Sequence, residues 1–311
     1  MSKIENIDSI QLRLLEEVAE LHETPAGAYN IRANGEAVGR VSTENIEIIP
    51  KENGKGIDIR IKEGTKNESV HIPVVLSMSG LSEVVYNDFY VGDDADVLIV
   101  AGCGIHNDGN QDSRHDGIHR FFIGKNAKVN YVERHYGEGD GNGKRILDPV
   151  TEVTLGENSY MEMEMVQIKG VDSTKRTTTA ELDKGAKLVI RERLLTHGSQ
   201  YAESGFVVHL NGEDSSANVI SRAVAKDHSK QLFLAEINGN NKCAGHSECD
   251  AIIMDEANIS AIPKITANDV NAALIHEAAI GKIAGEQLIK LMTLGLTEAE
   301  AEEQIVNGFL K

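Results

Sequence analysis

Gly92-Asp-Asp-Ala-Asp-Val-Leu-Ile-Val and Gly124-Lys-Asn-Ala-Lys-Val-Asn-Tyr-Val share one pattern: a polar turn, a small residue, then an alternating strand. The pattern recurs along the chain, and we place its small residue at Ala95, Ala127, Ser159, Ala186, Ala217 and Ala257. These positions are 32, 32, 27, 31 and 40 residues apart. Repeats of about 20–50 residues are typical of solenoids and arrays.

Each repeat fits one coil of a β-solenoid. No segment between the turns has the helical pattern of about 10–15 residues that βαβ units need. Inward apolar side chains would then stack on the coils above and below. Shorter strands are expected before the repeats, at 46–50, 57–61 and 70–76. The competing interpretation is an antiparallel β-sandwich, because single repeats also resemble hairpins.

Helices are expected at both ends of the solenoid. Residues 5–23 form one amphipathic pattern, with Asp8 or Ser9 as N-cap and a stop at Pro25-Ala26-Gly27. Further helices are expected after Asn268. Three features mark the ends of these helices: Gly295 suits a C′ position, Thr297 and Glu300 form a capping box, and the last helix runs from Glu298 to about Asn307 with Gly308 as its C′ residue. These helices could cap the open ends of the solenoid or provide docking surfaces.

Composition excludes several functional classes. The 311-residue chain carries 49 acidic and 31 basic residues, a net charge of −18. This charge argues against nucleic-acid partners and anionic membrane surfaces. Three cysteines do not make a disulfide framework, so a reducing, cytoplasmic location is expected. The charged first 25 residues predict no secretory signal, and no apolar run approaches the length of a membrane span.

Cysteine, histidine and carboxylate meet in the last seventy residues. Cys249 precedes an apolar run, and His276 and Glu277 are expected to open a helix. Thiolate, imidazole and carboxylate together suit iron or zinc better than magnesium or calcium. Each residue also has a structural interpretation. A buried cysteine is usually an inert apolar side chain, and a carboxylate at a helix start is usually a cap.

A second cluster lies between residues 103 and 135. Cys103, His106, His115 and His119 have the spacing C-x2-H-x8-H-x3-H, which is compatible with metal ligation. A zinc-dependent enzyme using these four residues is therefore an alternative function, although the acids nearby also fit a solvated loop. The glycine-rich stretch 137–144 contains two acids and no phosphate-loop motif, so any ATP hydrolysis must come from a partner.

Motifs spread over residues 75–311 resemble the SufB/SufD family of iron–sulfur cluster assembly scaffold proteins. The upstream match is A-G-C-G from Ala101, followed by I-H-R-F-F-I-G-K-N-A-K-V-N-Y from Ile118. The downstream matches, in order, are Glu248-Cys249-Asp250, His276-Glu277-Ala278, Lys282-Ile283, Gln287-Leu288, Gly295-Leu296-Thr297-Glu298 and Ile305-Val306-Asn307-Gly308-Phe309. The resemblance implies a right-handed parallel β-helix and decides against the sandwich.

The resemblance also implies roles for individual residues. Cys103 matches a cysteine associated with sulfur acceptance, and protonated neighbours such as His106 would favour its reactive thiolate. Cys249 and Glu277 are the first-choice ligands of a transient iron–sulfur cluster, with His276 and Cys103 next. The remaining candidates are His119, which matches a family histidine, and Cys243, which would complete a local C-x2-H-x2-C set, Cys243-His246-Cys249.

Partners follow from the same resemblance. It implies a SufC-type ABC ATPase docked on the helical tail, where we expect contacts from Gln287, Leu288, Leu291 and Leu294. It also implies a homodimer through the β-helix and a sulfur donor, either a cysteine desulfurase or sulfide. The chain itself is then a scaffold, not an enzyme. We expect three regions: an N-terminal helical segment (1–27), the β-helix (28–267) and a C-terminal partner-binding region (268–311).

Overall fold

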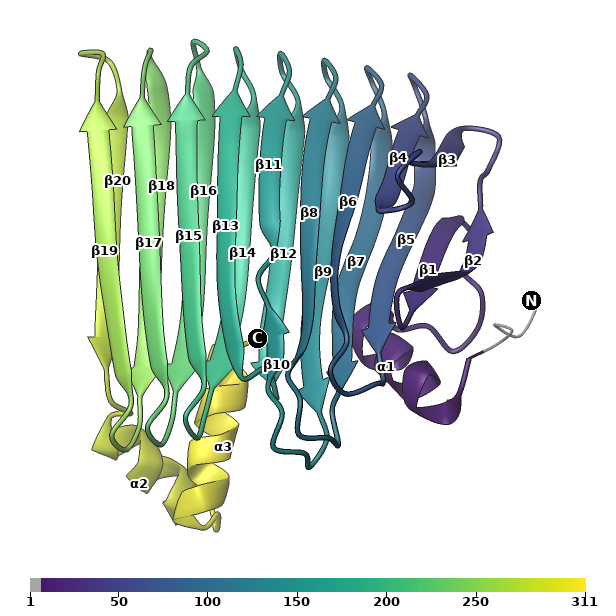
Figure 1. The fold of residues 1–311 in the computed structure, drawn as a ribbon. Helices are drawn as coiled ribbons and strands as arrows, with labels where there is room; N and C mark the ends of the chain where they lie inside the picture. Colours follow the sequence, from purple (N-terminus) through teal and green to yellow (C-terminus); the bar gives the residue numbers. More distant parts are fainter. Residues whose placement is uncertain (1–6) are drawn as a thin grey trace.

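Two long sheets face each other in this computed structural model, which describes residues 7–311 (Figure 1). Sheet A contains, in spatial order, β2 (Glu36–Val41), β1 (Ala28–Ala33), β5 (Lys66–Leu76), β7 (Asp96–His106), β9 (Lys128–Glu138), β12 (Tyr160–Lys169), β14 (Lys187–Thr196), β16 (Ser215–Ala225), β18 (Cys243–Ile253) and β20 (Ala273–Gly281). Sheet B contains β19 (Asn258–Ala267), β17 (Lys230–Gly239), β15 (Tyr201–Leu210), β13 (Ser173–Leu182), β10 (Arg145–Leu147), β8 (Ser113–Ile123), β6 (Ser82–Val91), β4 (Gly56–Ile61) and β3 (Ile46–Pro50), with β11 (Val150–Leu155) beside β13 and β8.

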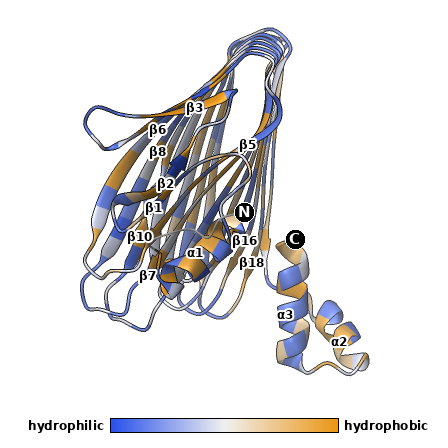
Figure 2. Cartoon of the chain, turned by 90° about the vertical axis from the view of Figure 1, so that its right-hand side faces the viewer, coloured by the Kyte–Doolittle hydropathy of each residue, from blue (hydrophilic) through white to orange (hydrophobic). Residues whose placement is uncertain are grey.

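Strand pairing confirms the parallel β-helix. From β4 to β9 and again from β12 to β20, successive strands alternate between the sheets, and each pairs in parallel with the strand two along the chain, as β7 does with β5 and β9. Between these stretches β10 and β11 both lie in sheet B, so β9 pairs with β12. The described strands include two antiparallel pairs, β1–β2 and β3–β4, and these hairpins form the N-terminal end. The sheets converge at the turns that lead into sheet A and diverge at the opposite turns (Figure 2).

Inward side chains form ladders along the solenoid axis. One ladder in sheet A places Val97, Val129, Met161 and Leu188 in register, and all four are buried. In sheet B, the rings of Phe89 and Phe121 stack at 4.4 Å. Because each strand alternates, every second residue enters this core and its neighbours stay outside.

The small-residue positions are confirmed at the first four repeats and wrong at Ala217, whereas Ala257 does follow a turn and precede a strand, but in the other sheet. The amides of Ala95, Ala127, Ser159 and Ala186 each close a turn onto a carbonyl three residues earlier. In the next coil that bond comes from Ser215 to Gly212, not from Ala217, because this turn has the same length as the others. Ala257 closes a turn of the opposite kind, which leads into β19 of sheet B.

Helix α1 spans Ser9–Ala19, shorter than the predicted 5–23, of which residues 5 and 6 lie outside the described part. Asp8 is the N-cap, as predicted, and forms a capping box with Gln11. Leu14 and Val18 are fully buried against the outer face of sheet A. Gly102 allows this approach, because a Cβ there would lie 2.7 Å from the Val18 carbonyl oxygen. The helix therefore covers a sheet face, and the expectation that it caps an end is wrong.

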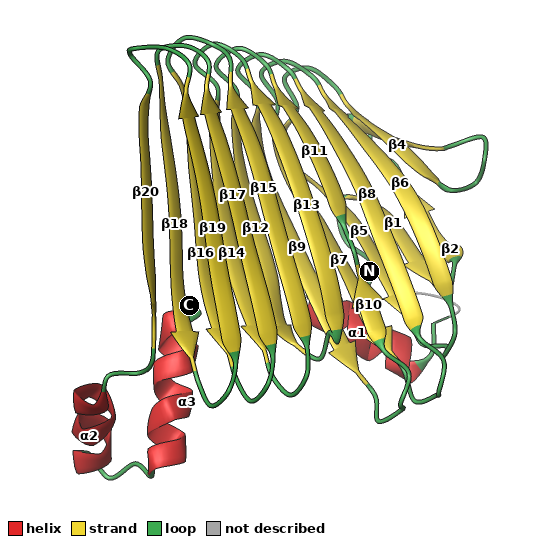
Figure 3. Ribbon diagram, turned by 60° about the vertical axis from the view of Figure 1, so that its left-hand side comes forward, coloured by secondary structure: helices red, strands yellow, loops and turns green. Residues whose placement is uncertain are grey.

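The C-terminal region begins with a strand. His276 and Glu277 lie within β20, so the predicted helix start at this pair is wrong: the backbone pairs with β18 over the whole segment. Helices follow at α2 (Gly285–Thr293) and α3 (Glu298–Phe309), beneath the lower turns (Figures 1 and 3). The capping box of Thr297 and Glu300 is confirmed, whereas Gly308 lies inside α3.

Strands β19 and β20 are the last strands of their sheets, and helices α2 and α3 do not cover them. Large apolar side chains are exposed there: Ile262, Ile265, Ile275 and Ile280. The solenoid is therefore open at this end. No helix within the described residues is long and apolar enough to cross a membrane.

Candidate functional site

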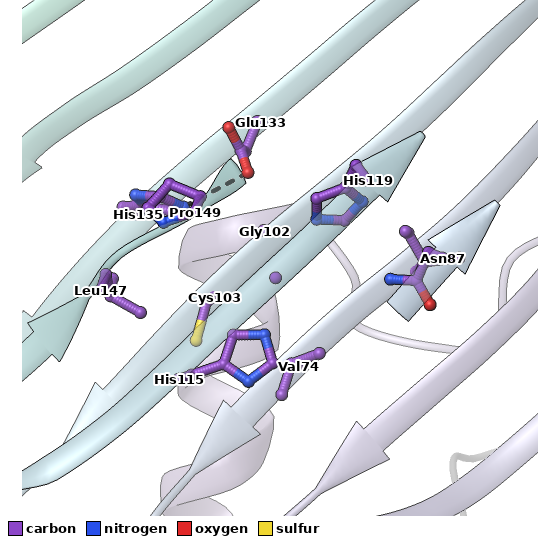
Figure 4. Close-up of a pocket in the computed structure, with 12 residues that line it drawn as sticks. Val74, Asn87, Gly102, Cys103, His115, His119, Glu133, His135, Leu147 and Pro149 are labelled. Carbon is purple, nitrogen blue, oxygen red and sulfur yellow. Dashed lines mark ion pairs between the residues drawn. The ribbon is translucent and has the colours of Figure 1, made fainter. Parts of the chain in front are cut away.

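Cys103 faces the interior of the solenoid beside a small polar cavity (Figure 4). Its side chain lies near the end of β7, in the half of the strand where the sheets diverge. His115, His119, Glu133 and His135 line the same cavity. The volume of about 20 Å³ is enough for one water molecule.

A buried ionic network continues from this cavity along the solenoid. Glu133 forms an ion pair with Arg176 and lies 3.4 Å from His135 Nε2. Arg176 Nε lies 4.0 Å from an oxygen of Glu192, and Arg176 Nη2 lies 3.3 Å from His135 Nδ1. Each of these side chains is at least 94% buried. One cation therefore stabilises two interior carboxylates across the gap between the sheets.

The network ends beside Cys249. The hydroxyls of Ser204 and Ser221 donate hydrogen bonds to Glu192, the second at 2.8 Å. Ser221 is the register partner of Cys249, whose side chain is 1% exposed. The inward row of sheet A thus carries Glu133, Glu192 and Cys249 on strands β9, β14 and β18.

Cys103 and Cys249 lie at opposite ends of this polar interior. They belong to β7 and β18, which are five strand spacings apart in sheet A. At about 4.8 Å per spacing the separation is about 24 Å, too far for the two thiols to share a metal ion or a cluster. Cys103 is therefore not a co-ligand of Cys249 within one protomer.

Burial suppresses the thiolate form of both cysteines. Desolvation, aided by the charges of Glu83 and Glu133, raises the pKa of Cys103 well above its usual value. Desolvation and the charge of Glu192 raise the pKa of Cys249 to about 12. The expectation that His106 activates Cys103 is wrong. His106 points away from the cavity, to the outer side of β7, where it contacts Asp108 and Glu138.

His119 is a buried group whose protonation is expected to affect stability between pH 7 and 4. Desolvation is the main cause that lowers the pKa of His119 to about 4. Because the unfolded chain takes up this proton near pH 6.5 and the folded chain does not, stability falls as pH drops through this window. We expect a loss of about 2 kcal/mol between pH 7 and pH 4.5. Urea unfolding at both pH values measures this loss in the free energy of unfolding. His119→Gln should remove most of the loss between pH 7 and pH 4.5. A variant that loses as much stability as the wild type would show that His119 is not the cause.

Cys243 occupies a structural position. It is the register partner of Ser215, so it takes the small-residue place after the turn. Cys249 lies six positions further along the extended strand, which is a separation of about 20 Å at about 3.3 Å per position. His246 lies between them with its side chain on the opposite face of β18. The proposed C-x2-H-x2-C set is therefore wrong, because the extended strand separates its members.

The other predicted ligands divide between the two faces of sheet A. His276 pairs with Ser247 and shares the inner face of Cys249, whereas Glu277 pairs with Glu248 and points outward. On that outer face, ligand atoms of His246, Glu248 and Glu277 all lie within 4.8 Å of one another. Across the described residues, this is the one cluster of histidine, cysteine and acidic side chains tight enough to hold a metal ion.

The sequence pattern of the family described as "SUF system FeS cluster assembly, SufBD core domain" matches residues 83–309. This range contains Cys103, Cys249 and the ionic network between them. The chain belongs to the SufBD family.

Archaeal SufBD family proteins are similar over most of this chain. A protein of Archaeoglobus fulgidus named "Iron-sulfur cluster assembly SufBD family protein" is 31% identical over 266 residues, which is 84% of this chain and 69% of that protein. A protein of Methanocaldococcus jannaschii with the same family name is 29% identical over 260 residues, 81% of this chain and 79% of its own length. A protein of Methanothermobacter thermautotrophicus is 28% identical over 231 residues, 73% of this chain and 55% of its own length.

The zinc alternative finds no support in this SufBD protein. Cys103, His115 and His119 line the cavity, but His106 does not. Their ligand atoms do not form a compact group within the described part of the chain.

Sequence reasoning missed the ionic network of the SufBD interior. Glu133, Arg176 and Glu192 are the missed residues. The sequence does contain a signal for them. Each is a charged residue at an inward position of an alternating strand, where an apolar residue is expected.

Proposed function

We propose that this SufBD protein is a scaffold on which an iron–sulfur cluster is assembled and from which it is released. The polar interior that joins Cys103 to the region of Cys249 is the observation that carries the proposal. A solenoid core is normally apolar, and a buried ion pair is weak support for stability, so this network is better explained by function. Anaerobic reconstitution with iron and sulfide, argued in the Discussion, tests it.

The two cysteines take different roles in this proposal. Sulfur carried as a persulfide by a cysteine desulfurase is transferred to the thiol of Cys103, whereas free sulfide joins the nascent cluster directly. Cys249 ligates the nascent cluster, and His276 faces the same interior one strand away. The protein itself performs no ATP hydrolysis. The three free cysteines fit a reducing, cytoplasmic setting.

A second copy of the chain is proposed to cover the open end at β19 and β20. Unpaired strand edges readily pair with another chain, and exposed isoleucines line both strands there. Because Cys249 lies on β18, one strand from this end, ligands from a second copy can complete the cluster site.

A SufC-type ABC ATPase is proposed to dock on α2 and α3. Leu294, the C-cap residue of α2, is 76% exposed, and Ile289 and Met292 within this short helix are also exposed. Gln287 is exposed as well, and Leu288 and Leu291 are half-buried. Helix α2 contains no buried residue, so its apolar side chains are free for a partner.

Removing residues 282–311 is expected to abolish co-purification of the ATPase while the solenoid stays folded. The truncation ends after β20, so every described strand is retained. Leu288→Glu with Leu294→Glu is the matched test in the full chain, with Lys290→Glu on the same helix as control. Retention of the ATPase by the truncated protein would contradict this docking site.

A further inference from the structure

A histidine and two carboxylates converge on the outer face of sheet A, near the open end. His246 and Glu248 project from β18, and Glu277 projects from β20. Glu248 and Glu277 are direct register partners on adjacent strands. Cys249 follows Glu248 in the chain, so its thiol lies on the opposite face and is no member of this group.

The side chain of Asn218 orients the imidazole of His246. Its Nδ1 lies 3.0 Å from Asn218 Oδ1, while its Nε2 lies 3.6 Å from an oxygen of Glu277. An amide oxygen at Nδ1 selects the tautomer that carries its proton there, which leaves the Nε2 lone pair directed at the carboxylates. Metal-ligating histidines typically have such a second partner.

The two carboxylates lack the paired cation that Glu162 and Glu164 have on the same face. Like charges directly opposite on neighbouring strands destabilise a sheet. Elsewhere on sheet A, Glu162 accepts a hydrogen bond from Arg191 at 3.0 Å. Among the described residues, no lysine or arginine forms an ion pair with Glu248 or Glu277, although the groove beside Glu248 is lined by Arg191, Arg193, Arg222 and Lys311. A bound cation would compensate both charges.

We propose that His246, Glu248 and Glu277 bind a divalent first-row metal ion of the ferrous class. One imidazole and two carboxylates suit Fe²⁺, Mn²⁺, Co²⁺ or Zn²⁺, with water completing the coordination. The site holds iron on one face of β18 while the thiol of Cys249 faces the other. Its role as the iron-loading site rests on the proposed function; metal binding itself does not.

Anaerobic titration of the purified protein with Co²⁺, without sulfide, tests the site. We expect one equivalent to bind with visible d–d absorption and no thiolate-to-cobalt charge-transfer band. His246→Ala and Glu277→Gln should each weaken binding at least about tenfold, and Asn218→Ala about tenfold through loss of orientation. Cys249→Ser and Glu162→Gln, an outer-face acid that already has a cation partner, should bind like the wild type.

Three results would overturn the site: a charge-transfer band, loss of Co²⁺ binding in Cys249→Ser, or unchanged affinity in His246→Ala with the urea midpoint preserved. The iron-loading role is tested separately, by following cluster formation with sulfide supplied and Fe²⁺ limiting.

His246→Ala should form clusters more slowly than the wild type when Fe²⁺ is limiting, and at the wild-type rate when Fe²⁺ is in excess. Equal rates at limiting Fe²⁺ would overturn the iron-loading role. If no cluster forms even in the wild type, the proposed function fails while the Co²⁺ result stands.

Discussion

Cys249→Ser is expected to lose the iron–sulfur cluster after anaerobic reconstitution, with bound iron reduced at least about tenfold. The wild type should gain a sulfide- and thiolate-to-iron charge-transfer band in the visible region. The physical reason is ligand softness: a thiolate is the preferred protein ligand of iron–sulfur clusters, and a serine hydroxyl is a poor substitute. Iron coordination also offsets the raised pKa of the Cys249 thiol, because a coordinating thiol is deprotonated by the metal.

Two further cysteine variants serve as matched controls. Cys243→Ser changes the same strand at a structural position and should keep the charge-transfer band. Cys103→Ser should also keep it when free sulfide is supplied, and lose it when sulfur comes from a desulfurase. If Cys249→Ser retains both band and iron, Cys249 is not a ligand and the site must be sought elsewhere. Bound iron and acid-labile sulfide, measured together, decide the outcome.

The repeat pattern predicted stacked coils because it has a direct physical cause, although the family resemblance was needed to decide against a β-sandwich. A polar turn followed by a small residue recurs wherever the chain must bend tightly into the next strand of sheet A. The prediction placed the small residue of the fifth repeat at Ala217, two residues too late. Ser215 is also small, and only its backbone hydrogen bond to Gly212 shows that it is the residue after the turn. The strand containing His276 looked helical because its alanines and glutamate favour helices in isolation, whereas pairing with β18 overrides that preference.

The sequence named candidate residues for the site but could not group them. Cys103, Cys249 and Glu277 were all named, yet the face on which each side chain lies depends on strand phase. A difference of one position separates Glu248, outside, from Cys249, inside. The Glu133–Arg176–Glu192 network joins three strands, and its partners are far apart in sequence, so no local pattern pairs them.

Arg176→Leu is expected to destabilise the protein by about 3–5 kcal/mol, because it leaves two buried carboxylates without their cation. Although burial opposes ionisation, Arg176 and His135 hold the pKa of Glu133 well below its ordinary value. Without Arg176, the charge that opposes the effect of burial is lost, so the pKa of Glu133 in the folded state rises. A raised carboxyl pKa makes the folded state relatively more stable at low pH, so the deficit against the wild type should shrink as pH falls.

Urea unfolding with hydrogen exchange in β9, β13 and β14 measures this loss, since solenoid coils can open locally. Arg191→Leu is the matched control: it breaks a partly exposed ion pair with Glu162 on the outer face and should cost less than about 1 kcal/mol. Adding Glu133→Gln to Arg176→Leu should recover part of the loss, because it removes one of the two uncompensated charges. An Arg176→Leu variant as stable as the control would show that the interior carboxylates are neutral or hydrated. In that case the ionic network would no longer support a functional interior, and only Cys103 and Cys249 would support it.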